Sequence, residues 1–115
     1  MTLSDQHILE INSAAKSFLV ARQPPKHIRK QLDVGYRIEG QSVFIFEIRP
    51  AWDNPDKIIE IPVAKTTFVK QKDHWKVYWM RADLKWHVYP EAPTVKSVND
   101  FFILVDRDEF SCFWG

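Results

Sequence analysis

The hydrophobic pattern begins with helical spacing. Apolar residues recur three and four positions apart and share one helix face: Ile8, Ile11, Ala15, Phe18 and Leu19. Ser4 precedes them and is a suitable N-cap, because its hydroxyl can accept from the free amides of the first turn. Pro24 and Pro25 end the pattern, since proline cannot continue a helix. The sequence therefore predicts an N-terminal helix that stops before Pro24.

From Leu32 onward, the period of the pattern changes to two. The segments "LDVGYRIE" and "SVFIFEIR" flank Gly40-Gln41, and glycine in the first turn position favours a type II′ hairpin. The strand at 42–49 is apolar on both of its faces, which is typical of a strand covered on both sides. A third strand region, "KIIEIPVAKTTFVK", contains Pro62, which predicts a sheet edge, a bulge or a break there.

Two further strands are predicted at 75–80 and 84–89, joined by a three-residue loop, Arg81-Ala82-Asp83. This register pairs Tyr78 with Trp86 and divides the hairpin into two faces. The face predicted to be core comprises Tyr78, Met80, Leu84, Trp86 and Val88. The amphipathic face comprises Trp75, Val77, Trp79, Lys85, His87 and Tyr89. We expect the second face to be the open one, because lysine is almost never fully buried without a partner.

A short helix is predicted at 95–105, capped by Ser97 or Thr94. The final "EFSCFWG" is expected to form a short strand or a tail that packs its rings against the body. Consecutive strands with short turns favour an antiparallel sheet with helices beside it. The predicted class is α+β: a single antiparallel sheet of about five strands, with an N-terminal helix and a short C-terminal helix, in a single domain spanning 1–115.

Composition and charge exclude several classes of protein. The chain has 115 residues, 14% of them aromatic, and a net charge of +1, which gives no overall attraction to nucleic acid or anionic membrane. One cysteine excludes an internal disulfide and a cysteine-rich zinc site. No apolar run reaches the roughly 18 residues of a membrane span, and the first residues do not resemble a secretory signal. We expect a cytoplasmic, bacterial-type protein without a cofactor.

The strongest candidate for a ligand-binding site is the amphipathic hairpin face. Rings beside cations can stack bases and hold phosphates, as in proteins that bind single strands. Residues 22–37 and 65–89 are each net +4, so a basic patch forms if the two segments meet on one face. The predicted ligand-binding residues are Trp75, Trp79, Arg81, Lys85, His87 and Tyr89, with Arg29 and Lys30. The alternative is that these rings belong to the core.

Catalytic and metal-binding patterns are weaker. Glu60 and Lys65 are five apart, whereas metal-dependent nucleases place their acid and lysine two apart on one strand face. The histidines show no paired spacing with each other or with Cys112, which is more typical of a small buried residue than of a nucleophile. An enzyme that cleaves phosphodiesters with a metal remains an alternative, with Glu47, Asp83 and His87 as its residues.

Four segments together resemble a known family: "YRIEGQSVFIFEIRPAW", "PVAK", "WKVYWMRADLKWHVY" and "CFWG". The chain is similar throughout its length to short bacterial proteins catalogued as domain of unknown function 3024, and departs only at "DEFS". This resemblance implies a free-standing domain and brings no activity or catalytic residues. Our interpretation is a non-enzymatic binding module for single-stranded nucleic acid or another anionic partner. A homodimer that uses the tryptophan face as its interface is a further alternative.

Overall fold

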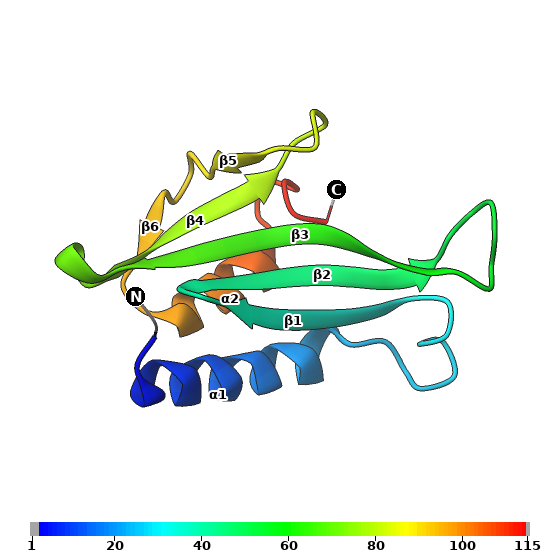
Figure 1. The fold of residues 1–115 in the computed structure, drawn as a ribbon, viewed down its shortest axis with the longest axis horizontal. Helices are drawn as coiled ribbons and strands as arrows, with labels where there is room; N and C mark the ends of the chain where they lie inside the picture. The colour runs from blue at the N-terminus through cyan, green and yellow to red at the C-terminus, as the bar shows by residue number, and fades with distance from the viewer. Residues whose placement is uncertain (1–2, 115) are drawn as a thin grey trace.

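The computed structural model describes residues 3–114, which form one antiparallel sheet with two helices packed on the same face (Figure 1). The elements are α1 (Asp5–Arg22), β1 (Asp33–Glu39), β2 (Ser42–Pro50), β3 (Ile58–Val69), the 3-10 turn η1 (Lys70–Lys72), β4 (His74–Met80), β5 (Trp86–Val88), β6 (Thr94–Val95) and α2 (Val98–Arg107). Within this part of the chain, the strands run β1-β2-β3-β4-β5, and β6 pairs with β4. The predicted α+β class is confirmed.

The N-terminal helix α1 begins and ends where the sequence predicts. The Ser4 hydroxyl accepts from the His7 amide at 3.1 Å, and the His7 ring accepts from the Ser4 amide, so both free amides are satisfied. The helix ends at Arg22, immediately before Gln23 and the two prolines. Its apolar face, which includes Ile11 and Phe18, is buried against the sheet.

The hairpin of β1 and β2 has the predicted two-residue turn. Glu39 pairs with Ser42, and of the two turn residues only Gly40 has a positive φ, +58°, as a type II′ turn requires. Strand β2 lies between β1 and β3, so it is internal, as expected of a strand that is apolar on both faces. The expectation that both faces are covered was wrong, since both helices pack on one side of the sheet. Val43 and Ile45 face the helices and are fully buried.

Pro62 coincides with an irregularity in β3. Ile45 pairs with Ala64, but Phe46 pairs with Pro62, so Val63 is an additional residue in β3. Strand β4 pairs with β3 only from Ala64 onward, which leaves residues 58–63 without a partner strand on that side. The proline therefore marks both a bulge and a local edge, two of the three outcomes that the sequence predicted.

The hairpin of β4 and β5 differs from the prediction. Its loop spans residues 81–85, and Tyr78 pairs with Val88 instead of Trp86. The wider turn is held by Leu84 at φ +62° and by the Asp83 carboxylate, which accepts from the Lys85 amide at 3.0 Å. A shift of two residues keeps the side chains of each predicted group together on one face, except for Leu84 and Lys85, which lie in the loop. The burial of the two faces is nevertheless the reverse of the prediction. The face that carries Trp75, predicted to be open, packs on the helices, and the face that carries Trp86, predicted to be core, is open.

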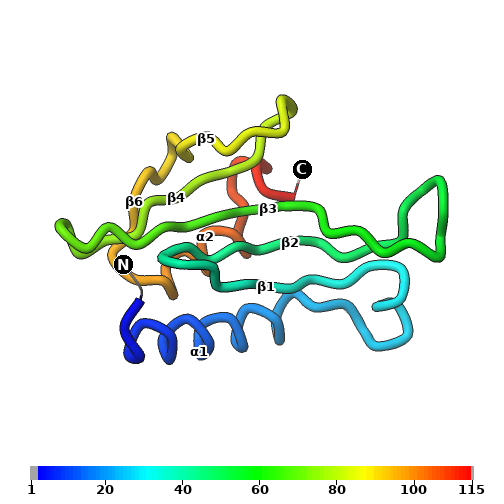
Figure 2. Tube along the Cα trace, viewed as in Figure 1, coloured from blue at the N-terminus to red at the C-terminus, as the bar shows by residue number. Residues whose placement is uncertain are grey.

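Helix α2 and the tail complete the core. Ser97 caps α2 by accepting from the Asp100 amide at 3.1 Å, whereas Thr94, the other candidate cap, belongs to β6. The chain after α2 turns back beside that helix as a tail and not as a strand (Figure 2). The Trp114 indole donates to the Val105 carbonyl at 2.9 Å, and its ring lies over Phe18. Gly115, the last residue of the predicted tail, lies outside the described residues.

Candidate functional site

The face of the sheet opposite the helices is left open and carries four aromatic rings, one of which, Phe46, is buried. Phe44 on β2, Tyr78 on β4 and Trp86 on β5 are half-buried on this face. The ring centroids of Phe44 and Trp86 are 6.1 Å apart. We call this surface the open sheet face. Within residues 3–114, both helices pack on the other side (Figure 1).

Two lysine side chains lie against these rings. The Lys65 ammonium is 5.6 Å from the centroid of the Phe44 ring and 5.1 Å from that of Tyr78. The Lys76 ammonium is 5.8 Å from the Tyr78 centroid. All of these distances are within the range of a cation–π attraction. The open sheet face therefore combines apolar ring surface with positive charge.

A small hollow lies in the same face beside Trp86. It measures about 190 Å³, and its walls are apolar side chains and three charged groups: Phe44, Ile45, Phe46, Pro62, Trp86, Arg37, Glu39 and Glu60. The Arg37 guanidinium donates to Glu60 Oε1 at 2.5 Å and lies 4.9 Å from the Phe46 ring centroid. The hydrogen bond to Glu60 raises the pKa of Arg37. Together, these residues form a site that is apolar on its sides and ionic at its rim.

Two of the predicted site residues belong to the core, so their expected exposure was wrong. Trp75 is 2% exposed, and its ring lies 5.2 Å from that of Phe68. Tyr89 is 1% exposed, and its ring lies 4.8 Å from Phe113. Burial raises the pKa of Tyr89 to about 12. Neither ring can present its face to a ligand without opening the core.

The other four predicted hairpin residues gather around the 81–85 loop. The Trp79 ring packs against the core, and the Arg81 guanidinium lies 5.6 Å from its centroid. His87 Nε2 lies 2.8 Å from Asp83 Oδ2, and this hydrogen bond lowers the pKa of Asp83. Lys85 is exposed within the loop and on neither strand. These four residues form a cluster at the loop, and this cluster does not include the half-buried rings of Phe44, Tyr78 and Trp86.

Arg29 and Lys30 lie elsewhere, on the connection between α1 and β1. The Arg29 guanidinium donates to the Pro24 carbonyl at 2.8 Å. Arg29 also lines a shallow hollow beside α1, together with Asn12 and Tyr36. The structure therefore does not join these two cations to the aromatic hairpin.

The three residues of the catalytic alternative are not assembled. In the sheet, His87 pairs with Trp79, Trp79 with Ala64, and Ala64 with Ile45, while Glu47 lies two residues farther along β2. Three strand spacings therefore separate the backbones of Glu47 and His87, about 14 Å. Glu47 is paired with Arg49 instead. Among the described residues, no group of three or more His, Cys, Asp and Glu side chains is arranged to hold a metal ion.

Cys112 is half-buried and not fully buried as expected. Its thiol donates weakly to the Phe110 carbonyl, with Sγ 3.6 Å from the oxygen. Burial raises the pKa of the thiol, and the Asp108 carboxylate adds to this shift. A raised pKa disfavours the thiolate, which is the reactive form, so the environment does not favour a nucleophile.

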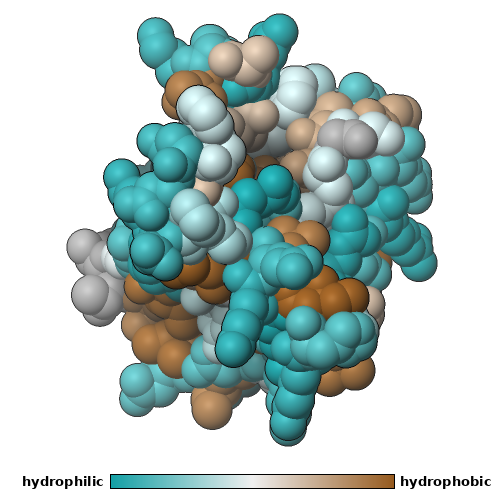
Figure 3. All heavy atoms as spheres, turned by 90° about the vertical axis from the view of Figure 1, so that its right-hand side faces the viewer, coloured by the Kyte–Doolittle hydropathy of each residue, from teal (hydrophilic) through white to brown (hydrophobic). Residues whose placement is uncertain are grey.

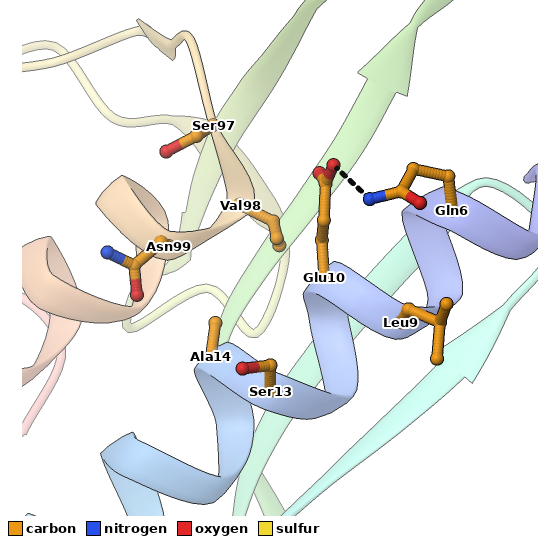
Figure 4. Close-up of a pocket in the computed structure, with 8 residues that line it drawn as sticks. All are labelled: Gln6, Leu9, Glu10, Ser13, Ala14, Ser97, Val98 and Asn99. Carbon is orange, nitrogen blue, oxygen red and sulfur yellow. Dashed lines mark hydrogen bonds between the residues drawn. The ribbon is translucent and has the colours of Figure 1, made fainter.

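Two other surface features lie outside the open sheet face. A groove of about 520 Å³ lies between α1 and the start of α2, where Gln6 donates to Glu10 at 3.2 Å and no cation or aromatic ring lines the wall (Figure 4). At the end of the molecule formed by the β2–β3 connection, apolar patches alternate with hydrophilic side chains (Figure 3). Trp52 is 95% exposed in that connection, and Ile58 is exposed beside it.

The sequence contained a signal for the correct side of the hairpin. Lys76 precedes Tyr78 by two residues on a strand, so both side chains must share a face. That lysine marks the Tyr78 side as the open one. Lys65 gives the same indication, since it pairs with Tyr78 on the neighbouring strand. Lys85 indicates the opposite side only if it lies on a strand, and it lies in the loop.

The fold and this site define a small α+β protein whose sheet is covered by helices on one face and open on the other. The family model described as Domain of unknown function (DUF3024) matches residues 3–115, and the chain belongs to this family. The resemblance noted from the sequence motifs is thereby confirmed. No curated protein and no solved structure compared with the chain matches it. In the part of the chain that the structure describes, neither helix is long and apolar enough to cross a membrane.

Proposed function

We propose that this protein is a non-enzymatic binding module that holds single-stranded nucleic acid on the open sheet face. The observation that supports the proposal is the arrangement of Phe44, Tyr78 and Trp86, with lysine ammonium groups 5.1 to 5.8 Å from two of these rings. Aromatic platforms with adjacent cations are the usual means by which proteins bind single strands without sequence preference.

The chemistry of the face suits a single strand better than a duplex. In a duplex, the bases are stacked on one another, so their faces are not available to side-chain rings. An unpaired base can stack on Tyr78 or Trp86, while the Lys65 ammonium moves from the ring to a phosphate. Each stacked base contributes about 1–3 kcal/mol to binding.

The charge distribution supports an anionic ligand despite the net charge of +1. Arg37 belongs to the basic segment 22–37, and Lys65 and Lys76 belong to the basic segment 65–89. Strand pairing brings all three side chains to the open sheet face, through the neighbours β1, β2, β3 and β4. We propose that they form its basic patch. A free thiol suits the reducing cytoplasm of a bacterium, where we propose that the protein works.

The test is fluorescence anisotropy with labelled ten-nucleotide RNA and DNA of mixed sequence. We expect binding at 50 mM salt that weakens steeply by 200 mM, as for any ligand held through phosphates. Tyr78→Ala should weaken binding about 5- to 150-fold, the equivalent of one lost base stack. Trp52→Ala is the matched control, because this ring is 95% exposed in a loop, and binding should be unchanged. No binding by the wild-type protein at 50 mM salt overturns the proposal.

The same samples distinguish the alternatives. Shortening of the oligonucleotide that depends on added Mg²⁺ would indicate a phosphodiester-cleaving enzyme. A mass of twice 13.6 kDa in light scattering that returns to 13.6 kDa in Tyr78→Ala would make the open sheet face a dimer interface. Either outcome replaces the binding module with another function.

A further inference from the structure

The hollow beside Trp86 has the size and shape of a site for one planar ring. Its volume of about 190 Å³ is below the roughly 300–1,000 Å³ of pockets that enclose drug-sized ligands. The rings of Phe44 and Trp86 stand 6.1 Å apart at an angle of 55°, and Phe46 closes the site on the side of Arg37. A single base could enter edge first and stack on either ring, while its sugar and phosphate remain outside.

The rim of the hollow carries a donor and an acceptor side by side. Arg37 Nη2 donates to Oε1 of Glu60. Because each carboxylate oxygen can accept two hydrogen bonds, both oxygens of Glu60 and the other guanidinium donors remain available to a ligand. Both side chains are nearly half exposed, at 45% and 46%, so a ligand can reach them. The Arg37 guanidinium is held in place by the Phe46 ring and by Glu39, whose carboxylate lies 3.8 Å away.

An exposed ion pair of this kind does little for the stability of the fold. Both partners are solvated, so the Coulomb attraction is largely offset by the entropy of fixing two long side chains. The pair connects β1 to β3 across β2, strands that are already joined through their backbones. What the pair provides is a fixed combination of carboxylate and guanidinium beside an aromatic hollow.

We infer that this hollow is a guanine-binding site within the proposed nucleic-acid surface, with Glu60 and Arg37 as the groups that select the base. Among the four bases, guanine alone presents two neighbouring donors, N1–H and the 2-amino group, which match a carboxylate. Its O6 is an acceptor next to them, and arginine donates readily to O6 of guanine. Adenine, cytosine and uracil each present at most one such donor to Glu60, and hydrogen bonds to a carboxylate are among the strongest.

This inference rests on the proposed function, and the experiment separates the two. Labelled oligouridine RNAs of eight nucleotides, each with one central guanine, adenine, cytosine or inosine, are titrated by anisotropy. We expect the guanine RNA to bind about 5- to 150-fold more tightly than the adenine RNA, the usual discrimination of a bidentate contact. Inosine lacks the 2-amino group and should lose most of this preference.

Glu60→Gln should abolish the ratio of guanine to adenine affinity, because an amide offers only one acceptor oxygen. Deleting a negative charge should raise the affinity for every RNA by a similar factor, and this factor cancels in the ratio of guanine to adenine affinity. Glu10→Gln, which removes the same charge on the helix face, should leave the ratio unchanged. Equal wild-type affinity for all four RNAs overturns the guanine site and leaves the single-strand proposal standing. Absence of binding to every RNA overturns both.

Discussion

The ring of Trp86 lies 6.1 Å from the ring of Phe44, although β3 and β4 separate their strands. In a flat sheet, these two backbones would be about 14 Å apart, at three strand spacings. The two side chains therefore lean toward each other across β3 and β4. The sheet is also twisted, and Figure 1 shows β4 and β5 rotated relative to β1 and β2.

Replacing Trp75 and Trp86 should have opposite consequences. Trp75→Ala removes a ring that is 2% exposed and should lower the free energy of unfolding by about 3–5 kcal/mol. Trp86→Ala removes a half-buried ring on the open sheet face, so it should cost less stability and weaken RNA binding. Urea unfolding followed by circular dichroism measures the first effect, and anisotropy the second. Equal destabilisation by both changes would contradict this division of the hairpin.

The lysines of the open sheet face should determine the salt dependence of binding. For a single strand, the slope of log K against log salt changes by about 0.7 for each phosphate contact. Lys65→Gln and Lys76→Gln should each reduce the slope by about this amount, and the double variant by about twice as much. Lys85→Gln is the control, since this residue lies in the 81–85 loop. An unchanged slope in the double variant would place the phosphates elsewhere.

Asp83 should make the hairpin loop sensitive to acid. Its hydrogen bond to His87 lowers its pKa, so the unfolded chain binds the proton more tightly than the folded one. The stabilising contribution is therefore present above about pH 4 and is lost as the pH falls through the lower, folded-state pKa. Carbon-13 NMR of the Asp83 carboxyl should show the low pKa, and His87→Phe should raise it. A pKa that stays low in this variant would assign the shift to the Lys85 amide.

Tyr89 should make the protein sensitive to alkali. Burial raises its pKa to about 12, against about 10 in an unfolded chain, because the phenolate would lose its hydration. Stability from this group is complete below about pH 10 and is lost as the pH rises through about 12. Absorbance at the tyrosinate band should show a late ionising step. Tyr89→Phe should remove that step, and a late step that persists would belong to another tyrosine.

Local chemistry explains which elements the sequence predicts correctly. Helix α1 is predicted because its cap at Ser4 and its end before Pro24 depend on neighbouring residues alone. The turn at Gly40 is predicted for the same reason, since glycine takes a positive φ without strain. The 81–85 loop is not predicted, because it requires a positive φ at Leu84, and nothing in a leucine signals that conformation.

The sequence pointed to the β4–β5 hairpin, but none of the predicted ligand-binding residues belongs to the open sheet face, and Tyr78 and Trp86 were assigned to the core. Apart from Leu84 and Lys85, which lie in the loop, the two faces of the β4–β5 hairpin contain the residues that the sequence assigned to them, since a register shift of two preserves the alternation. Which face is buried depends on where the helices pack. The inference that the Lys85 face is open was wrong because Lys85 lies in the loop and not on a strand. The approach of Phe44 to Trp86 depends on the pairing of four strands and has no signature in either segment.

The unpaired stretch of β3 at 58–63 bears on how this protein behaves at high concentration. A free edge with exposed Ile58 and Ile61 is a template on which a second chain can add a strand, the first step of aggregation. Pro62 has no amide hydrogen to offer such a strand, and the bulge at Val63 disturbs the spacing that continuous pairing requires. The irregularity in β3 therefore disfavours self-association through this edge. Pro62→Val should make the protein aggregate at concentrations at which the wild type stays monodisperse.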